Sequence, residues 1–478
     1  MSGKFNQIEI DFFKSALASD SEVFPNAKIL SWIKRKNEEV IVNVAQISLD
    51  KLRCWEFCDE KGKLIHESGK FFSIEGIQVE TNWSNVTHWE QPIINQPEVG
   101  FLGILAKKIN GVLHFLMQAK IEPGNINNVQ ISPTLQATKS NYTRIHKGKT
   151  PLFLEYFNGE KNVKILLDQL QSEQGARFLH KRNRNIIVEV NECEHLNIPD
   201  NFIWITLGQL KSLIKQDNIV NMDTRTVISG IPFGSYGTDT LEYFSVLNKS
   251  DRINEYLLNS VINDEIYLRN FSQILSWITD LKSRYELFVY SSPLKNLKHW
   301  EYDGFSISHE DKKYFSVIGV NVAIGNREVV SWDQPMIRPA QEGIIAFITK
   351  RIDDVYHFLV QAKLEAGNLD VIELAPTVQC LTGNYRTGHN EYSVPFIKEV
   401  LTAPQSKIWY SAMQSEEGGR FFKEQNRNMI IEANSDFPTE VPDKYCWMTL
   451  NQLLTFIKFN NYLNIAARSL IAAVTFSV

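Results

Sequence analysis

The chain has 478 residues, 43% hydrophobic and 22% charged, which is typical of a soluble globular protein with two or three domains. Its formal net charge of −5 argues against a nucleic-acid or membrane-surface binder, and no apolar run approaches the roughly 20 residues of a membrane span. The N-terminus lacks the apolar core of a signal peptide and the five cysteines are scattered, so we expect free thiols and a cytoplasmic protein.

The chain contains two tandem copies of one sequence unit. A twelve-residue stretch that begins at His114 returns 243 positions later at His357, with nine identities. The same offset relates 172–178 to 415–421, and before Trp89 it slips to 245. A two-member array with so long a period indicates two whole domains rather than a solenoid. We place a first repeat at 1–223, a linker at 224–263 and a second repeat at 264–478.

Both repeats are predicted to mix strands and helices. In chain order we expect strands at 40–44, 71–74, 100–105, 114–120 and 185–190, and a helix at 207–215 capped by Thr206. After a Gly/Ser stretch at 229–237 that reads as an ordered linker or a loop over a site, we expect a helix at 271–278 capped by Ser272, strands at 343–348, 357–363 and 428–432, and a helix at 450–458 capped by Thr449. Each repeat is therefore α+β, with a mostly antiparallel or mixed sheet and helices at its ends.

The strand at 114–120 has a polar face and an apolar face. Because side chains alternate along a strand, His114, Gln118 and Lys120 share one side while Phe115 and Met117 face the core. A polar row that runs into a turn can form the wall of a polar ligand site. A solvated outer face is the commoner alternative in an antiparallel sheet. The polar row is retained in both repeats, which favours the ligand site.

A second polar cluster follows this strand in each repeat, at 136–146 and 379–389. Gln, Asn, Tyr and His hold the same register in both copies while their neighbours differ. These groups supply directed hydrogen bonds and positive charge for a phosphorylated or sugar-like ligand. A turn in which Asn141 and Asn384 bond their own backbone is the alternative, and for these two residues both interpretations stay open.

Motifs for common cofactors are absent from the sequence. It has no Gly-x-x-x-x-Gly-Lys-Ser/Thr phosphate loop, no Gly-x-Gly-x-x-Gly, no Gly-x-Ser-x-Gly and no His-Glu-x-x-His. We therefore expect no cofactor and no metal, and a reaction that side chains perform unaided.

Four doubled motifs resemble those of the NDP-hexose 2,3-dehydratases: His-Phe-Leu-x-Gln-Ala-Lys-x-Glu-x-Gly-Asn, Pro-Thr-x-Gln, Asn-Tyr and Trp-x-Gln-Pro. The resemblance covers nearly the whole chain. It implies a cofactor-independent lyase of deoxysugar biosynthesis that acts on dTDP-4-keto-6-deoxyglucose. It also implies a tandem duplication of a Nudix-like mixed-sheet domain flanked by helices, and we expect a homodimer.

Two other functions remain as alternatives. The Arg-Glu-x-x-Glu-Glu-x-Gly helix that holds the metals of a Nudix hydrolase is absent, which argues against a Nudix-type hydrolase. A non-catalytic nucleotide-sugar-binding protein is the other alternative. The shared glutamate and histidines favour catalysis, because a binder of a diphosphate gains nothing from a nearby carboxylate.

The implied reaction needs a base, an acid and a partner for negative charge. A C4 ketone acidifies the C3 proton, and the resulting enolate expels the C2 hydroxyl. The base candidates are Glu122, Glu365, His114, His357, His146 and His389. The acid candidates are Tyr142 and Tyr385, and the candidate enolate or phosphate partners are Lys120 and Lys363.

Substrate-binding candidates lie beside these groups. Trp55 and Trp300 can stack on thymine, although a core position is commoner for tryptophan. The cations expected near the diphosphate are Lys139, Arg144 and Arg386. The remaining candidates are Gln118, Gln136, Thr138, Ser140, Asn141, Tyr142, Gln361, Gln379, Thr382, Gly383, Asn384 and Tyr385. We predict that both repeats bind a dTDP-sugar and that one of them turns it over, and the sequence leaves open which one.

Overall fold

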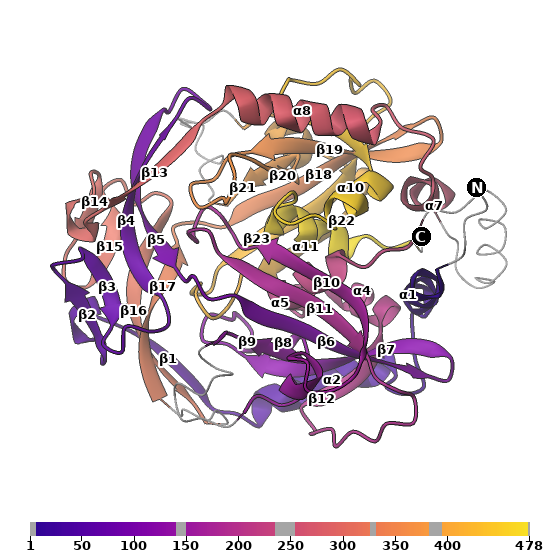
Figure 1. Ribbon diagram of the computed structural model, residues 1–478, viewed down its shortest axis with the longest axis horizontal. Helices are drawn as coiled ribbons and strands as arrows, with labels where there is room; N and C mark the ends of the chain where they lie inside the picture. Colours follow the sequence, from indigo (N-terminus) through magenta and orange to yellow (C-terminus); the bar gives the residue numbers. More distant parts are fainter. Residues whose placement is uncertain (1–5, 140–149, 235–253, 326–330, 382–393, 477–478) are drawn as a thin grey trace.

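The computed structural model describes residues 6–139, 150–234, 254–325, 331–381 and 394–476. Two large sheets with their helices form one side of the molecule in Figure 1, and two small sheets form the other. The α+β prediction is confirmed. Every helix in the described ranges falls short of the length and apolar character that a membrane crossing demands.

The first repeat builds one large sheet. Its strands are β6 (Gly100–Ile109), β7 (Val112–Ile121), β8 (Val129–Ser132), β9 (Leu135–Ala137), β10 (Lys164–Ser172), β11 (Arg182–Glu189) and β12 (Phe202–Thr206). Their order is β10-β11-β6-β7-β12, with β8 beside β7 and β9 beside β6. β11 runs parallel to β6 and the other pairs are antiparallel, so the sheet is mixed, as expected.

The second repeat builds a large sheet with the same pairings. Its strands are β18 (Gly343–Ile352), β19 (Val355–Lys363), β20 (Glu373–Pro376), β21 (Val378–Cys380), β22 (Ile408–Ser415), β23 (Gln425–Glu432) and β24 (Tyr445–Thr449). β18 again has a parallel neighbour, β23, and an antiparallel one, β19. The predicted strands therefore lie where expected, within a few residues at their ends.

Most helices pack against one face of each large sheet, and the short helix at 397–401 packs against the opposite face of the second. In chain order the helices are α1 (Gln7–Leu17), α2 (Asn26–Glu38), α4 (Leu207–Ile214), α5 (Met222–Ser229), α7 (Glu255–Ile262), α8 (Phe271–Arg284), α9 (Ile397–Leu401), α10 (Leu450–Phe456) and α11 (Ile465–Ala473). Apolar side chains of the helices join Phe115 and Met117 in the main core. The segment at 153–157 covers the other face of the first sheet, where Leu116 is buried. The polar side of the β7 strand is therefore not a solvated face.

The capping predictions are confirmed for two helices and wrong for a third. The hydroxyls of Thr206 and Thr449 accept the N–H of the third residue of α4 and α10, in complete capping boxes. The cap of α8 is Asn270, not Ser272. The Asn270 side chain accepts the N–H of Gln273, whose side chain bonds the Asn270 backbone in return. This places Ser272 inside the first turn.

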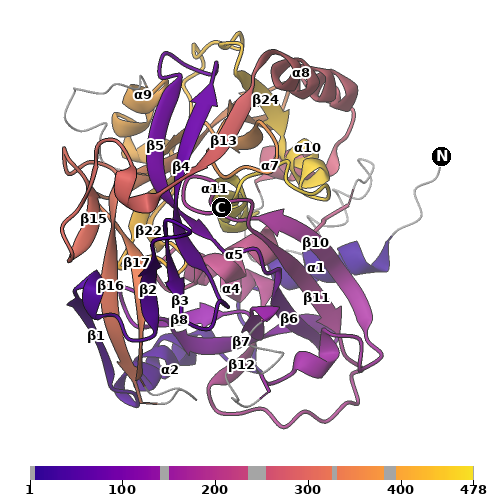
Figure 2. The same ribbon diagram turned by 60° about the vertical axis from the view of Figure 1, so that its left-hand side comes forward.

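The two small sheets exchange strands between the repeats. They contain β1 (Val42–Ile47), β2 (Trp55–Cys58), β3 (Lys63–His66), β4 (Ser73–Thr81), β5 (His88–Asn95), β13 (Leu287–Ser292), β14 (Trp300–Tyr302), β15 (Ser306–His309), β16 (Phe315–Ile324) and β17 (Ser331–Pro339). β1 pairs with β16 of the second repeat, and β13 pairs with β4 of the first. Figure 2 shows β13 of the second repeat lying along β4 of the first. Each repeat thus completes a sheet of the other.

Helices α5 and α11 lie against each other at the centre of the molecule, between the two large sheets (Figures 1 and 2). Each carries a fully buried arginine that reaches across to the other repeat. Arg225 donates to the carbonyl oxygen of Ser415, and Arg468 donates to that of Ser172. The two serines end β22 and β10, so these bonds fix the turns that follow. The predicted linker contains α7 and most of α5, and the domain boundaries remain a prediction.

Candidate active site

Two cavities lie where the turn after β7 or β19 meets the opposite repeat. The large cavity, at the end of β19, has a volume of about 970 Å³. The small cavity, at the end of β7, has a volume of about 160 Å³. Sites for small molecules usually measure roughly 300–1,000 Å³. The large cavity is therefore the one whose size suits a nucleotide sugar.

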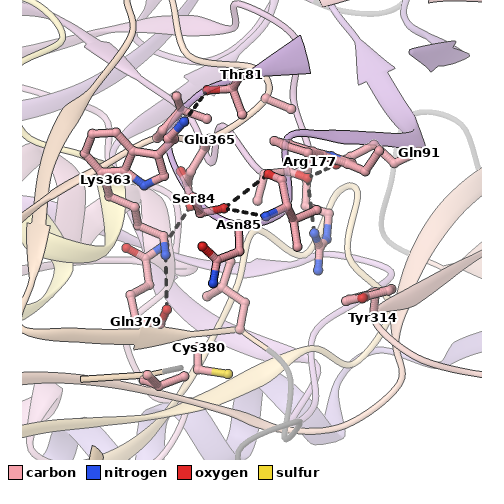
Figure 3. Close-up of a pocket in the computed structure, with 18 of the residues that line it drawn as sticks. Thr81, Ser84, Asn85, Gln91, Arg177, Tyr314, Lys363, Glu365, Gln379 and Cys380 are labelled. Carbon is pink, nitrogen blue, oxygen red and sulfur yellow. Dashed lines mark hydrogen bonds between the residues drawn. The ribbon is translucent and has the colours of Figure 1, made fainter. Parts of the chain in front are cut away.

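The buried side chain of Glu365 lines the large cavity (Figure 3). Glu365 follows β19, and Gln379 lies on β21, so the two strands bring their side chains together. Gln379 Nε2 donates to Glu365 Oε1 at 2.9 Å. Lys363 Nζ donates to the backbone oxygen of Gln379 at 3.3 Å. The sequence-predicted Lys363, Glu365 and Gln379 therefore meet in one site.

Burial makes Glu365 a stronger base than an exposed glutamate. Loss of solvent raises the pKa of its carboxyl, while the charges of Lys363 and Arg177 and the hydrogen bonds from Gln379 and the Gly175 backbone oppose the rise. A buried carboxylate with a raised pKa among cations in a cavity is a common arrangement for proton abstraction.

The first repeat supplies another wall of this cavity, through the turn at 172–178. Gly367 N–H donates to the carbonyl oxygen of Gly175 at 2.7 Å. A Cβ on Gly175 would lie 2.3 Å from Asn368 Oδ1 and 3.2 Å from Glu365 Oε2, so a larger residue there would displace the Asn368 side chain. Ala176, Arg177 and Gln91 also line the cavity, and Gln91 Nε2 donates to the Ala176 oxygen at 3.1 Å (Figure 3). The site is composite.

A hairpin tip between β4 and β5 lines the same cavity from the first repeat. Ser84 and Asn85 lie there with Trp83 (Figure 3). Lys444 of the second repeat places its Nζ 3.9 Å from the centroid of the Trp83 ring and donates to the Trp83 carbonyl oxygen. This contact fixes the hairpin against the second repeat.

The two candidate stacking tryptophans are mainly core residues. Trp300 Nε1 donates to the Glu90 oxygen at 2.8 Å, and Trp55 Nε1 donates to the Asp333 oxygen at 2.9 Å. Both rings are buried in the core between the small sheets. Trp300 still lines the large cavity, whereas Trp55 does not line the small one. A stacking role thus has structural support at Trp300 alone.

The strand histidines lie away from both cavities. His114 bonds Ser21 Oγ through Nε2 at 2.8 Å and the Val112 oxygen through Nδ1 at 2.9 Å. His357 bonds the Val355 oxygen at 3.1 Å. Burial lowers the pKa of both imidazoles. His114 and Lys120 are on the same face of β7, but six residues along a strand span roughly 20 Å. His114 therefore lies far from the end of β7 where Lys120 lines the small cavity.

The small cavity repeats the core of the large one. Gln136 Nε2 donates to Glu122 Oε1 at 2.8 Å, and Lys120 Nζ lies 3.4 Å from the same oxygen. Arg420 of the second repeat lines it as Arg177 lines the large cavity. Thr138 lies at its wall, and Lys139, like Gln118, is outside its lining. Gln361 lines the large cavity and donates to the Pro376 oxygen at 2.8 Å.

The small cavity differs from the large one in its charges. Asp223 and Glu417 line it, whereas Ala466 and Gln174 occupy the corresponding positions of the other repeat. Burial and neighbouring carboxylates raise the pKa of Asp223, and burial raises that of Glu417 to about 7. The two cavities are therefore chemically distinct.

Part of the second polar cluster lies outside the described residues. These candidates are Ser140, Asn141, Tyr142, Arg144, His146, Thr382, Gly383, Asn384, Tyr385, Arg386 and His389. Their roles stay predictions. Within the described ranges, no group of three or more His, Cys, Asp or Glu side chains is arranged to hold a metal ion.

Sequence reasoning missed the groups that the first repeat places at or beside the large cavity. Gly175 and Arg177 stand in the duplicated stretch at 172–178. The duplication marked this stretch, but the sequence did not indicate a role for it. Trp83 has no tryptophan at the corresponding position of the second repeat, so the duplication gave no signal for it.

Comparison with known proteins shows the family of the chain. A family model described as NDP-hexose 2,3-dehydratase matches residues 26–231 and 271–474. The chain is 45% identical over 462 residues to a dTDP-4-dehydro-6-deoxy-alpha-D-glucopyranose 2,3-dehydratase of Saccharopolyspora spinosa, covering 97% of this chain and 94% of the relative.

Two further relatives have the same name. The protein of Amycolatopsis orientalis is 40% identical over 465 residues, which are 96% of this chain and 92% of the relative. That of Streptomyces violaceoruber is 38% identical over 447 residues, 93% of this chain and 96% of the relative. With one family model matching both halves and close relatives along nearly its whole length, the chain belongs to the NDP-hexose 2,3-dehydratase family.

Proposed function

We propose that this protein is a dTDP-4-dehydro-6-deoxy-alpha-D-glucopyranose 2,3-dehydratase and that its reaction takes place in the large cavity. The observation that carries the proposal is Glu365, a buried carboxylate held by Gln379 beside Lys363 in a cavity of about 970 Å³. The names of three relatives support the substrate.

The reaction begins with proton transfer to Glu365. The carboxylate takes the C3 proton, and the electrons of the C3–H bond form an enolate whose charge rests on the C4 oxygen. The C4 carbonyl then re-forms while the C2–O bond breaks and a C2=C3 double bond appears. The leaving hydroxyl takes a proton from a general acid and departs as water. The net change is the loss of one water, with no oxidant or reductant.

The neighbouring residues have distinct proposed roles. Lys363 places a positive charge near Glu365 and stabilises the enolate or a substrate phosphate. Gln379 orients the carboxylate through its 2.9 Å hydrogen bond. Tyr385 remains the predicted general acid and lies outside the described residues. His114 and His357 are omitted from the proposal because neither lines a cavity.

The difference in volume between the cavities supports turnover in the second repeat. Binding of a dTDP-sugar by both repeats stays a prediction, and saturation at one ligand per chain in an equilibrium titration would contradict it.

A Nudix-like fold of each half and a homodimer are further proposals. The mixed sheet with flanking helices supports the first, and sedimentation at twice the mass of the chain would support the second.

Incubation with dTDP-4-keto-6-deoxyglucose in EDTA tests the function, with mass spectrometry as the readout. We expect a product lighter by one water. Cleavage of the diphosphate that depends on Mg²⁺ would indicate a Nudix-type hydrolase instead. Saturable binding with unchanged substrate would indicate a non-catalytic nucleotide-sugar-binding protein.

A further inference from the structure

We propose that Arg177 of the first repeat is a catalytic residue of the large cavity, where its guanidinium contacts the substrate beside Glu365. This inference rests on the proposed function. It means that the second repeat holds the base and the first repeat supplies a cation, so neither repeat contains a complete site.

The position of Arg177 is fixed by contacts with both repeats. Its Nη1 donates to the oxygen of Ala176 at 3.1 Å. Its guanidinium carbon lies 4.2 Å from the centroid of the Phe315 ring, which belongs to the second repeat. The residue is 6% exposed and lines the large cavity (Figure 3). A cation held this way is already oriented before substrate arrives.

The hydrogen bonds of Arg177 leave capacity for a ligand. A guanidinium has five N–H donors in a planar fork. The buried Nε of Arg177 has no hydrogen-bond partner among the described residues. Buried donors are nearly always paired in folded proteins, so an unpaired one beside a cavity indicates a missing partner. An oxygen of the substrate is the partner that this site offers.

Two of the three carboxyl groups near Arg177 have pKa values shifted towards the neutral form. The three carboxyl groups are those of Glu365, Glu416 and Glu424. Burial raises the pKa of Glu424 to about 8, so this carboxyl is mostly protonated at pH 7. Burial also raises the pKa of Glu416. Arg177 therefore keeps charge that an anionic group of the substrate can use.

This charge suits the reaction at Glu365. During proton abstraction, negative charge moves from the carboxylate to the C4 oxygen of the sugar. A fixed cation near both positions stabilises the charge as it moves, without reorganising at that moment. The cation also lowers the pKa of Glu365 against the effect of burial, which keeps more of the carboxyl ionised.

The chain offers a matched control in Arg420. Its Nη1 donates to the Gly419 oxygen at 2.8 Å, its guanidinium lies 4.1 Å from the Phe72 ring, and its Nε is also unpartnered among the described residues. It lines the small cavity. The two arginines thus have the same local packing and differ in the cavity that they face.

The test compares Arg177→Met, Arg177→Lys and Arg420→Met with the wild-type chain. Turnover of dTDP-4-keto-6-deoxyglucose is measured as kcat and KM across pH, with thermal melting as a fold control. We expect Arg177→Met to lower kcat by about 10²–10³-fold, as the loss of one preorganised donor typically does. Arg177→Lys should recover part of the lost kcat, because lysine restores the positive charge but not the planar set of N–H donors. Arg420→Met should match the melting change of Arg177→Met and lose far less kcat.

The pH profile separates a catalytic from a structural role. Without the Arg177 charge, the acidic limb of kcat/KM should move to higher pH as the pKa of Glu365 rises. Wild-type kcat and an unmoved profile in Arg177→Met would overturn the inference alone, as would equal losses of kcat in both methionine variants. A wild-type enzyme that leaves the substrate unchanged would overturn the proposed function, and the role of Arg177 with it.

Discussion

The backbone N–H of Gly367 donates a 2.7 Å hydrogen bond to the carbonyl oxygen of Gly175, and Gly124 makes the same 2.7 Å bond to Gly418. These bonds join the turn after β19 or β7 to the turn after β10 or β22 of the other repeat. Glu365 stands two residues before Gly367, and its carboxylate accepts hydrogen bonds from Gln379 of its own repeat and from the Gly175 backbone of the other. The proposed base is therefore positioned by the contact between the repeats and not by its own strand alone.

Replacement of Gly367 by alanine should destabilise the protein strongly. A Cβ at this position would lie 1.7 Å from the carbonyl oxygen of Phe178, which is backbone and cannot move aside. We expect Gly367→Ala to lower the free energy of unfolding by at least the roughly 1–3 kcal/mol typical of overpacking. Urea denaturation measures this. Gly325→Ala is the control, since the nearest atom to a Cβ there lies 3.9 Å away. Equal midpoints for the two variants would contradict the prediction.

Glu365→Gln should abolish most of the turnover, and Glu122→Gln should not. Removal of a general base typically costs about 10²–10⁴-fold in rate. The two variants are well matched, because each glutamate accepts one hydrogen bond from a paired glutamine, at 2.9 Å and 2.8 Å respectively. The expected difference is in kcat for dTDP-4-keto-6-deoxyglucose. A larger loss in Glu122→Gln would move the active site to the first repeat.

The two strand lysines should also behave differently when replaced by alanine. Lys363→Ala removes a charge beside the developing enolate, so the loss should fall mainly on kcat, by about 10²–10³-fold. Lys120→Ala breaks the ion pair with Glu122 and should affect binding or assembly more than chemistry. Kinetics, dTDP-sugar affinity and melting temperature are measured for both. If neither variant changes any of the three, these lysines are scaffold and the site lies elsewhere.

Within one repeat, the sequence predicted candidate residues that the structure brings together. Lys363, Glu365 and Gln379 come together because β19 and the short strand that carries Gln379 both pair with β18 in the same sheet. The N-caps Thr206 and Thr449 depend only on the adjacent turn. Local spacing is enough to predict such features.

Contacts across the repeats were beyond the sequence pattern. The alternation at 40–44 indicates a strand, but nothing in it specifies β16 of the second repeat as its partner. Arg177 lines the same cavity as Glu365 because the turns of the two repeats meet, so the duplication marked the stretch at 172–178 but did not connect it with this site. For His114 the alternation predicted the correct strand but not how far the residue lies from the cavity along that strand. This distance keeps the imidazole out of the cavity.

Buried Glu373 makes the stability of the protein depend on pH. Ser172 Oγ donates to its Oε2 at 2.8 Å, and its Oε1 has no partner among the described residues. Burial raises the pKa of this carboxyl to about 7 from its ordinary 4.5. Between these values the folded chain binds more protons than the unfolded one, so the free energy of unfolding falls as pH rises through this window.

The first repeat already shows the neutral alternative at this position. Gln130 corresponds to Glu373, and its Oε1 accepts from Ser415 Oγ at 2.9 Å in the same way. Glu373→Gln should therefore preserve the contact and remove the ionisation. We expect the variant to exceed wild-type stability at pH 8 by on the order of 1–3 kcal/mol, and the gain to shrink towards zero near pH 4.5. Gln130→Glu should show the opposite change. Urea denaturation at the two pH values measures both, and a gain in Glu373→Gln that is equal at both pH values would show that titration of this carboxyl does not cause it.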